Sequence, residues 1–158
     1  AGVDGVRVCW DGGLGGALVR GGGRRIGWFG ILATADGGYR VIPAGLVVRM
    51  DGIVVTRHVS EPAEVELKAG QRLPVRLDFG PLLLGDGQYL LSLGLYKKLD
   101  PNDIDPSEFY DYFDKSFEFQ VVGNPRLHNE LVRHPGEWTL AAASALPAGA
   151  EAEAARHP

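Results

Sequence analysis

The stretch Leu73-Pro74-Val75-Arg76-Leu77-Asp78-Phe79 alternates between large apolar residues and Pro, Arg or Asp. Successive side chains of a β-strand point to opposite faces, so this pattern predicts a strand with one face in a core and one in water. The segments Tyr89–Tyr96 and Phe117–Val122 repeat the alternation, with apolar residues at every second position. Half-buried strands of this kind are typical of antiparallel sandwiches and argue against a parallel sheet that is covered on both faces.

Turn residues separate several further β-rich runs. The 158 residues include 23 glycines and 10 prolines, which favour turns and mostly fall between the predicted strands. Asp51-Gly52 predicts a two-residue hairpin, because a type I′ turn needs positive φ at both central positions. The other expected strands are Leu46–Met50, Ile53–Val59, Val65–Leu67, Val6–Trp10 and Ile26–Ala33. The sequence therefore predicts an all-β fold, an antiparallel β-sandwich of Ig-like or jelly-roll type over residues 1–138. The Ala-rich residues 139–158 are expected to form a flexible tail.

Composition narrows the class of protein. A chain of 158 residues with 45% hydrophobic and 23% charged residues suits one soluble domain. The net charge of -4 and the scattered basic residues disfavour nucleic acid as a partner. No apolar run approaches the roughly 20 residues of a membrane-spanning helix. Cys9 is the single cysteine, which excludes an internal disulfide and favours a reducing compartment.

Motifs for catalysis, metals or nucleotides are weak. The glycines of Gly12–Gly16 match neither a phosphate loop nor a dinucleotide fingerprint, so we interpret them as a loop. The acidic segment Asp100–Glu108 could hold calcium, but Ile104 stands where an EF-hand needs an oxygen ligand, and an Asx- and Pro-rich loop is the simpler interpretation. The histidines, at positions 58, 128, 134 and 157, are dispersed and have no nucleophile at a recognisable spacing. We expect no catalytic residue, no metal site and no cofactor.

Aromatic residues with polar neighbours suggest a different chemistry. Trp and Tyr rings can stack on the C–H faces of sugars while amide and charged groups bind the hydroxyls. Among Trp28, Tyr39, Tyr96 and Trp138, the best candidate is Tyr96, which shares the outward parity of Ser92. Gly94 between them would leave room for a ligand to approach the sheet. The alternative for each ring is ordinary packing.

The order of turns and strands from residue 45 to 138 resembles the Wzt C-terminal domain, a module of ABC transporters that export bacterial O-antigen polysaccharides. The motifs that carry the resemblance are Leu67-Lys68-Ala69-Gly70, Leu84-Gly85-Asp86-Gly87-Gln88-Tyr89, Tyr112-Phe113-Asp114-Lys115-Ser116-Phe117 and His134-Pro135-Gly136-Glu137-Trp138. The resemblance implies a non-catalytic carbohydrate-binding module that recognises the modified end of an O-antigen polysaccharide. A structural or dimerisation sandwich attached to a glycosyltransferase or methyltransferase of polysaccharide assembly remains the alternative.

The resemblance also implies where the ligand and partners bind. The family binds glycan on the outer face of one sheet, and the positions with matching parity are Arg76, Ser92, Tyr96 and Gln120, to which Arg49 and His58 are added from the hairpin. It further implies a homodimer with an exchanged C-terminal strand, matched here to Leu127–Trp138, and a membrane transporter subunit as a partner of the parent protein. The expected location is cytoplasmic, at the inner face of the bacterial inner membrane.

Overall fold

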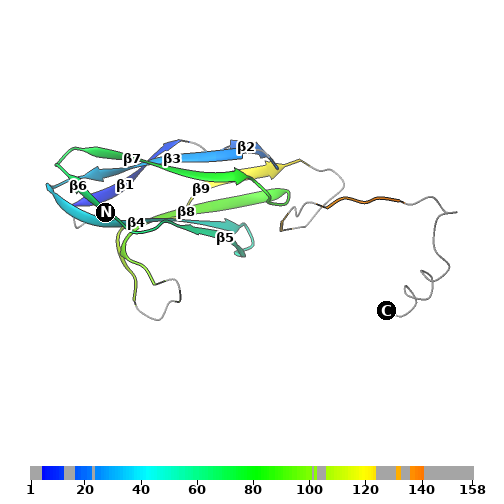
Figure 1. Cartoon of the computed structure of the whole chain (residues 1–158). Coiled ribbons are helices and arrows are strands. Elements are labelled where there is room, and N and C mark those ends of the chain that lie inside the picture. The colour runs from blue at the N-terminus through cyan, green and yellow to red at the C-terminus, as the bar shows by residue number, and fades with distance from the viewer. Residues whose placement is uncertain are drawn as a thin grey trace.

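The computed structural model describes residues 5–12, 17–22, 24–100, 102, 106–123, 131–132 and 136–140. Within these ranges the chain forms strands in two layers (Figure 1). The strands are β1 (Val6–Gly12), β2 (Ala17–Arg20), β3 (Arg24–Ala33), β4 (Gly37–Arg49), β5 (Val54–Val59), β6 (Ala63–Leu67), β7 (Arg72–Pro81), β8 (Gly87–Lys98) and β9 (Glu108–Val122). The predicted all-β sandwich is therefore confirmed.

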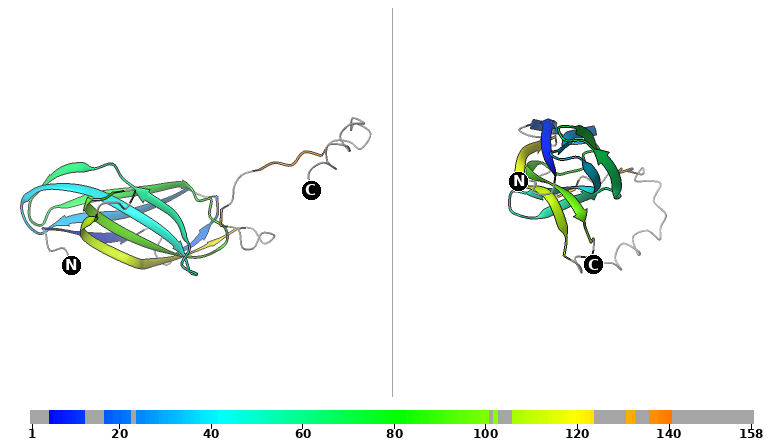
Figure 2. Two further views of the ribbon diagram at one scale, coloured as in Figure 1. Left: turned by 90° about the horizontal axis from the view of Figure 1, so that it is seen from below. Right: turned by 90° about the vertical axis from the view of Figure 1, so that its left-hand side faces the viewer.

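The two layers differ in size. One sheet has the order β1-β3-β7, and the other has the order β2-β9-β8-β4-β5, with β6 paired to the first half of β4. All strand pairs are antiparallel except β2 and β9, which run parallel. Figure 2 shows both layers from two further directions. In the described part of the chain, no helix has the length and hydropathy needed to cross a membrane.

The core lies where the alternation predicted it. Tyr89, Leu91, Leu93 and Leu95 of β8 are at most 1% exposed, and the apolar face of β7 packs against them from the other sheet. Burial of a Leu side chain contributes about 1.5–3 kcal/mol. The four inward residues of β8, the central strand of the larger sheet, thus supply much of the packing between the two layers.

Three parts of the strand layout differ from the sequence prediction. β4 begins at Gly37, well before the expected start at Leu46, and β9 begins at Glu108, so the aromatic run that follows belongs to a strand. The short strand β2 was not predicted. The hairpin after β4 is confirmed, but its loop has three residues, because Arg49 and Ile53 form the closing pair.

The turn type explains this difference. Gly52 has a φ of 91, whereas Asp51 is not in the positive region. The Asp51 carboxylate accepts hydrogen bonds from the Arg49 guanidinium and from the Ile53 N–H. These bonds fit a type I turn followed by a left-handed glycine, so the predicted type I′ turn is wrong.

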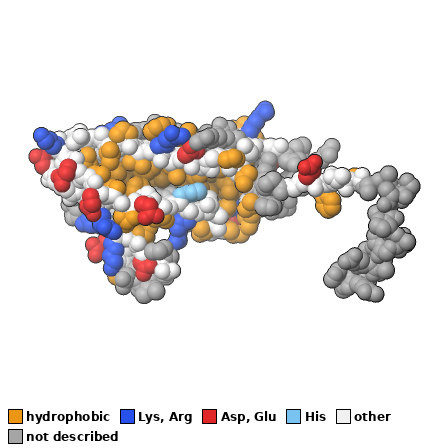
Figure 3. All heavy atoms as spheres, viewed as in Figure 1, with side chains coloured by type: hydrophobic (Ala, Val, Ile, Leu, Met, Phe, Trp, Pro, Cys, Tyr) orange, Lys and Arg blue, Asp and Glu red, His pale blue; other side chains and the backbone are white. Residues whose placement is uncertain are grey.

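One long side of the sandwich is closed and the other is open. On the closed side, the buried carboxylate of Asp111 in β9 accepts a hydrogen bond from the N–H of Val8 in β1 at 2.8 Å and so joins the two sheets. On the open side, the edge strands β5 and β7 are not paired with each other. Figure 3 shows apolar side chains gathered along this opening.

Candidate functional site

A hollow of about 280 Å³ lies on the outer face of the six-stranded sheet, and we call it the outer hollow. Its floor comes from β4 and β8, where Leu46 pairs with Ser92 and Ala44 pairs with Gly94. Its wall comes from β5, from β9 and from the loop between β8 and β9. The other lining residues are Gly45, Arg57, Val59, Tyr96, Leu99, Ser107 and Tyr112.

Two tyrosine rings stand over the glycine in this floor. A Cβ atom at Gly94 would lie 2.5 Å from Cε2 of Tyr96 and 3.0 Å from Cδ2 of Tyr112. The absence of a side chain at this position therefore makes room for the rings, and the expected open approach for a ligand above Gly94 is wrong. Phe109 extends the group, with its ring centroid 6.4 Å from that of Tyr96 and 6.3 Å from that of Tyr112. The result is an aromatic wall that faces solvent.

An arginine supplies positive charge at the rim. Arg57 of β5 pairs with Leu46 across the sheet, which places its side chain on the outer face. Its guanidinium has no hydrogen-bond or ion-pair partner among the described residues. An arginine in this state can donate two parallel hydrogen bonds to a carboxylate, a phosphate or a pair of sugar oxygens.

The Ser92 hydroxyl has a structural role in the floor of the hollow. Ser92 is 1% exposed, and its Oγ accepts the backbone N–H of Lys115 at 2.8 Å and lies 3.3 Å from Oδ1 of Asp114. The register between β8 and β9 shifts at this point, so three residues of β9 stand opposite Ser92. The hydrogen bonds of Ser92 therefore hold a bulge in β9, which carries Tyr112.

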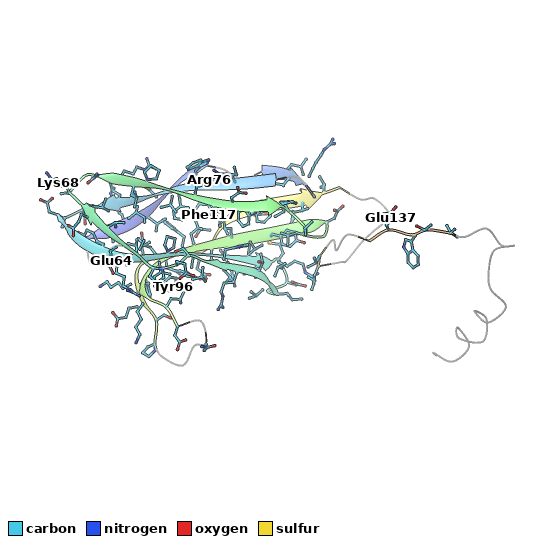
Figure 4. All side chains as sticks on the ribbon, viewed as in Figure 1. Glu64, Lys68, Arg76, Tyr96, Phe117 and Glu137 are labelled. Atoms are coloured by element: carbon cyan, nitrogen blue, oxygen red, sulfur yellow. The ribbon has the colours of Figure 1, made fainter. Side chains whose placement is uncertain are left out.

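The six residues that the sequence analysis predicted to bind the ligand do not lie at one site in the structure. Ser92 and Tyr96 line the outer hollow. Arg76 lies on the other sheet, and Figure 4 shows Arg76 and Tyr96 on opposite layers. His58 faces the open side of the sandwich. Gln120 shares the outer face, but its β8 partner Gln88 is eight residues from Tyr96, roughly 26 Å along the strand.

Arg49 lies at the hairpin, outside the hollow. It pairs with Tyr89 and its guanidinium forms an ion pair with Asp51. The hydrogen bond between the two side chains raises the pKa of Arg49 and lowers the pKa of Asp51. The guanidinium of Arg49 is thus already bound to the carboxylate of Asp51, and Arg49 does not line the outer hollow.

A second depression of about 450 Å³ follows the open side, and we call it the edge groove. It lies between two strand edges, with residues 57–59 of β5 and Ser60 after it on one side and residues 75–77 of β7 on the other, above an apolar floor that includes Phe29 and Leu93. His58 stands in the groove with its ring 5.1 Å from the ring of Phe79, and burial lowers the pKa of His58. Two facing strand edges with an apolar floor are suited to receive an extended peptide segment.

Sequence reasoning missed Arg57 and Tyr112. Both stand next to irregular pairing, since the register shifts between Val47 and Val48 and again between Leu91 and Leu93. Parity counted along one strand cannot reveal such shifts, and the hairpin around Asp51-Gly52 suggested His58 where the structure has its neighbour Arg57 in the hollow. A predicted strand that began at residue 108 would have placed Phe109 and Tyr112 near Tyr96, and this aromatic cluster would have indicated the site.

The acidic loop and the tail fall partly outside the described residues. Asp103 and Asp105 lie outside them, as do residues 141–158 and most of the expected exchanged strand. Among the residues that are described, no three His, Cys, Asp or Glu side chains form a group that could hold a metal ion.

Comparisons with known proteins were made by sequence and by structure. No family model matches the sequence, and no curated protein matches it. The crystal structure of the C-terminal domain of Wzt is similar over 78% of this chain and 74% of that chain, with a TM-score of 0.63 and 17% identity.

Weaker similarity extends to other proteins. The CARDB domain of the PF1109 protein from Pyrococcus furiosus has a TM-score of 0.43 at 11% identity, over 76% of this chain and 93% of that chain. A β-glucosidase from Listeria innocua has a TM-score of 0.46 at 15% identity, over 75% of this chain and 16% of that chain. In its fold, the chain is a β-sandwich similar to the Wzt C-terminal domain, as the resemblance in the sequence predicted.

Proposed function

We propose that this chain is a non-catalytic carbohydrate-binding module and that the outer hollow receives the end of a polysaccharide. The observation that carries the proposal is the presence, in one hollow, of the rings of Tyr96 and Tyr112 and of the Arg57 guanidinium, which has no partner among the described residues. The rings offer flat apolar faces for the C–H groups of a sugar, and the guanidinium offers donors for its oxygens. Ligand sites of this kind combine an apolar lining with a few placed polar groups.

The dimensions of the outer hollow favour a chain end over the middle of a chain. A volume of about 280 Å³ lies just below the usual range of roughly 300–1,000 Å³ for small-molecule sites. Leu99 and Ser107, from the loop after β8, border one side of the hollow. A terminal sugar with its modifying group would suit a hollow of this volume.

The identity of the polysaccharide is the finer part of the proposal. The similarity to the Wzt C-terminal domain supports a bacterial O-antigen polysaccharide with a modified end as the ligand. In that setting the parent protein works with a membrane transporter subunit, on the cytoplasmic side of the inner membrane. The module itself would then select the glycan, and it would do so without chemistry of its own.

The edge groove favours a second, compatible role in dimerisation. After β9 the chain returns to the sandwich, where Val132 pairs with Leu84 and the Gly85 N–H donates to the Leu131 carbonyl at 3.1 Å. Val132 also lines a depression of about 250 Å³ that borders His58 and Phe79, close to the edge groove. These contacts support a homodimer in which the segment Leu127–Trp138 is exchanged. They equally support a structural sandwich that joins the subunits of a polysaccharide-assembly glycosyltransferase or methyltransferase.

Calorimetric titration with purified O-polysaccharides tests the binding function. We expect Tyr96→Ala, Tyr112→Ala and Arg57→Gln each to weaken binding by about 1–3 kcal/mol, which is roughly tenfold per 1.4 kcal/mol. Arg40→Gln is the charge-matched control, because Arg40 forms an exposed ion pair with Glu64 at 3.6 Å and does not line the hollow. A folded domain that binds none of the glycans and forms a stable dimer would support the structural alternative instead.

A further inference from the structure

A second surface with exposed aromatic and basic groups lies on the outer face of the three-stranded sheet. Trp28 of β3 is 46% exposed at this face. Arg76 of β7 pairs directly with Trp28 across the sheet, and its guanidinium carbon lies 6.0 Å from the centroid of the indole ring. Single exposed aromatic residues are common on protein surfaces. What distinguishes Trp28 is that a charged group is held beside its ring.

Asp78 fixes the position of that charged group. Nη2 of Arg76 donates to Oδ2 of Asp78 at 2.8 Å, while Oδ1 of Asp78 accepts the N–H of Gly80 at 2.9 Å. An arginine side chain carries five N–H donors. Because Asp78 takes a donor from only one nitrogen of Arg76, the guanidinium keeps donors for a further acceptor while its place beside Trp28 is maintained.

A second arginine borders Trp28 from the other direction along the strand. Gly30 stands on the same face as Trp28, two residues further along β3, which is roughly 7 Å. The side chain of Arg72 lies across Gly30, since a Cβ atom at that position would collide with Arg72 Nε. The absence of a side chain at Gly30 thus lets Arg72 lie close to the sheet near the indole ring.

The charged side chains that the structure describes on this face have a net charge opposite in sign to that of the whole chain. Its described charged side chains are three arginines, Arg7, Arg72 and Arg76, and one acid, Asp78, which gives a net charge of +2. The chain as a whole has a net charge of -4. The described charged side chains of this face therefore attract an anionic ligand.

We propose that Trp28, Arg72 and Arg76 form a binding site for an acidic sugar residue, a pyranose that carries a carboxylate or a phosphate. The C–H face of the ring would pack on the indole, and the anionic group would accept hydrogen bonds from the guanidinium groups. The site lies on the opposite sheet from the outer hollow, so it adds a second contact with a glycan and stands independently of the function proposed for the hollow. A nucleic acid fits less well, because its affinity comes from neutralising many phosphates and this face offers few cations.

Calorimetric titration with a hexamer of galacturonic acid tests the site, with the methyl-esterified hexamer as the uncharged probe. The test variants are Trp28→Ala, Arg76→Gln and Arg76→Lys, of which the last keeps the charge and loses the planar fork of donors. Arg40→Gln removes one positive charge from an exposed ion pair elsewhere.

We expect the wild-type chain to bind the acidic hexamer and to bind the ester at least about tenfold more weakly. Trp28→Ala and both Arg76 variants should lose at least about tenfold in affinity for the acidic hexamer, while Arg40→Gln stays within about twofold of wild type. The proposal is overturned if the folded chain does not bind the hexamer, if Trp28→Ala binds it as wild type does, or if an oligothymidylate of equal charge binds as tightly. None of these outcomes depends on whether O-polysaccharide binds at the outer hollow.

Discussion

The hydroxyl of Ser92 accepts the backbone N–H of Lys115 at 2.8 Å, across the pair of strands β8 and β9. Lys115 has a φ of 46, and no other described non-glycine residue has a positive φ. A left-handed conformation costs roughly 1–2 kcal/mol for a residue with a Cβ atom. The hydrogen bond to Ser92 thus offsets part of this cost and keeps the bulge of β9 at one place, beside the aromatic wall of the outer hollow.

Replacement of Ser92 by Ala should lower the free energy of unfolding by about 1–3 kcal/mol, because the N–H of Lys115 then loses its acceptor. The same change should weaken glycan binding, since the bulge positions Tyr112. Lys115→Gly is the partner experiment: glycine adopts a positive φ without strain, but the N–H of residue 115 still needs its acceptor, so the Ser92→Ala loss should persist in that background. Denaturant unfolding of the four chains measures both effects. A Ser92→Ala loss that disappears in the Lys115→Gly background would contradict the role given to the hydrogen bond.

The substitution Gly94→Ala should greatly weaken glycan binding without unfolding the domain. A Cβ atom there meets the rings of Tyr96 and Tyr112, and rings at the surface can move aside. Their displacement would fill the hollow and separate the wall from Arg57. Gly136→Ala is a matched control, because nothing lies within 4 Å of the added atom. Full binding by a folded Gly94→Ala chain would place the ligand elsewhere.

The sequence was sufficient for the fold wherever a strand runs without interruption. The alternation predicted the strands β7 and β8 and their inward, core-facing residues correctly, since a period of two has one physical meaning in a half-buried strand. The first half of β4 was missed because Gly37, Gly38 and Gly45 break its apolar pattern. This half of β4 can be recognised as a strand only from the strands that pair with it.

The candidate site was predicted less completely than the fold, because strand parity shows which face of a strand a residue is on but not how the strands are ordered. Tyr96 and Ser92 were placed correctly on the outer face, because β8 keeps its parity up to that point. Arg76 has the outward parity too, but parity does not say to which sheet a strand belongs. Assigning Arg76 to the same surface as Tyr96 required the sheet order, which no local pattern contains.

Asp111→Ala should destabilise the closed side of the sandwich. The change leaves the buried N–H of Val8 without its acceptor at 2.8 Å, which should cost about 1–3 kcal/mol of unfolding free energy. Asp111→Asn should also destabilise, because one side-chain oxygen cannot replace two carboxylate oxygens that accept from Val8 and from Tyr112. Glu118→Gln, at an exposed position of the same strand, is the control and should change stability by less than about 0.5 kcal/mol. Hydrogen exchange at the Val8 amide would locate the effect in β1.

Protonation of His58 should make the stability of the fold depend on pH. Burial in the edge groove lowers the pKa of His58 below the ordinary value of 6.5, so the unfolded chain binds the proton more tightly than the folded chain. The unfolding free energy should therefore be at its full value above pH 6.5 and should fall as the pH drops below it. His58→Gln removes this titration and should flatten that part of the profile, which denaturant unfolding at pH 5.5 and pH 7.5 can measure.

If a peptide segment covers the groove in a dimer, the burial of His58 increases. The unfolding free energy of the wild-type dimer should then fall more steeply as the pH drops. A profile identical in wild type and His58→Gln would show that the groove leaves His58 in contact with water.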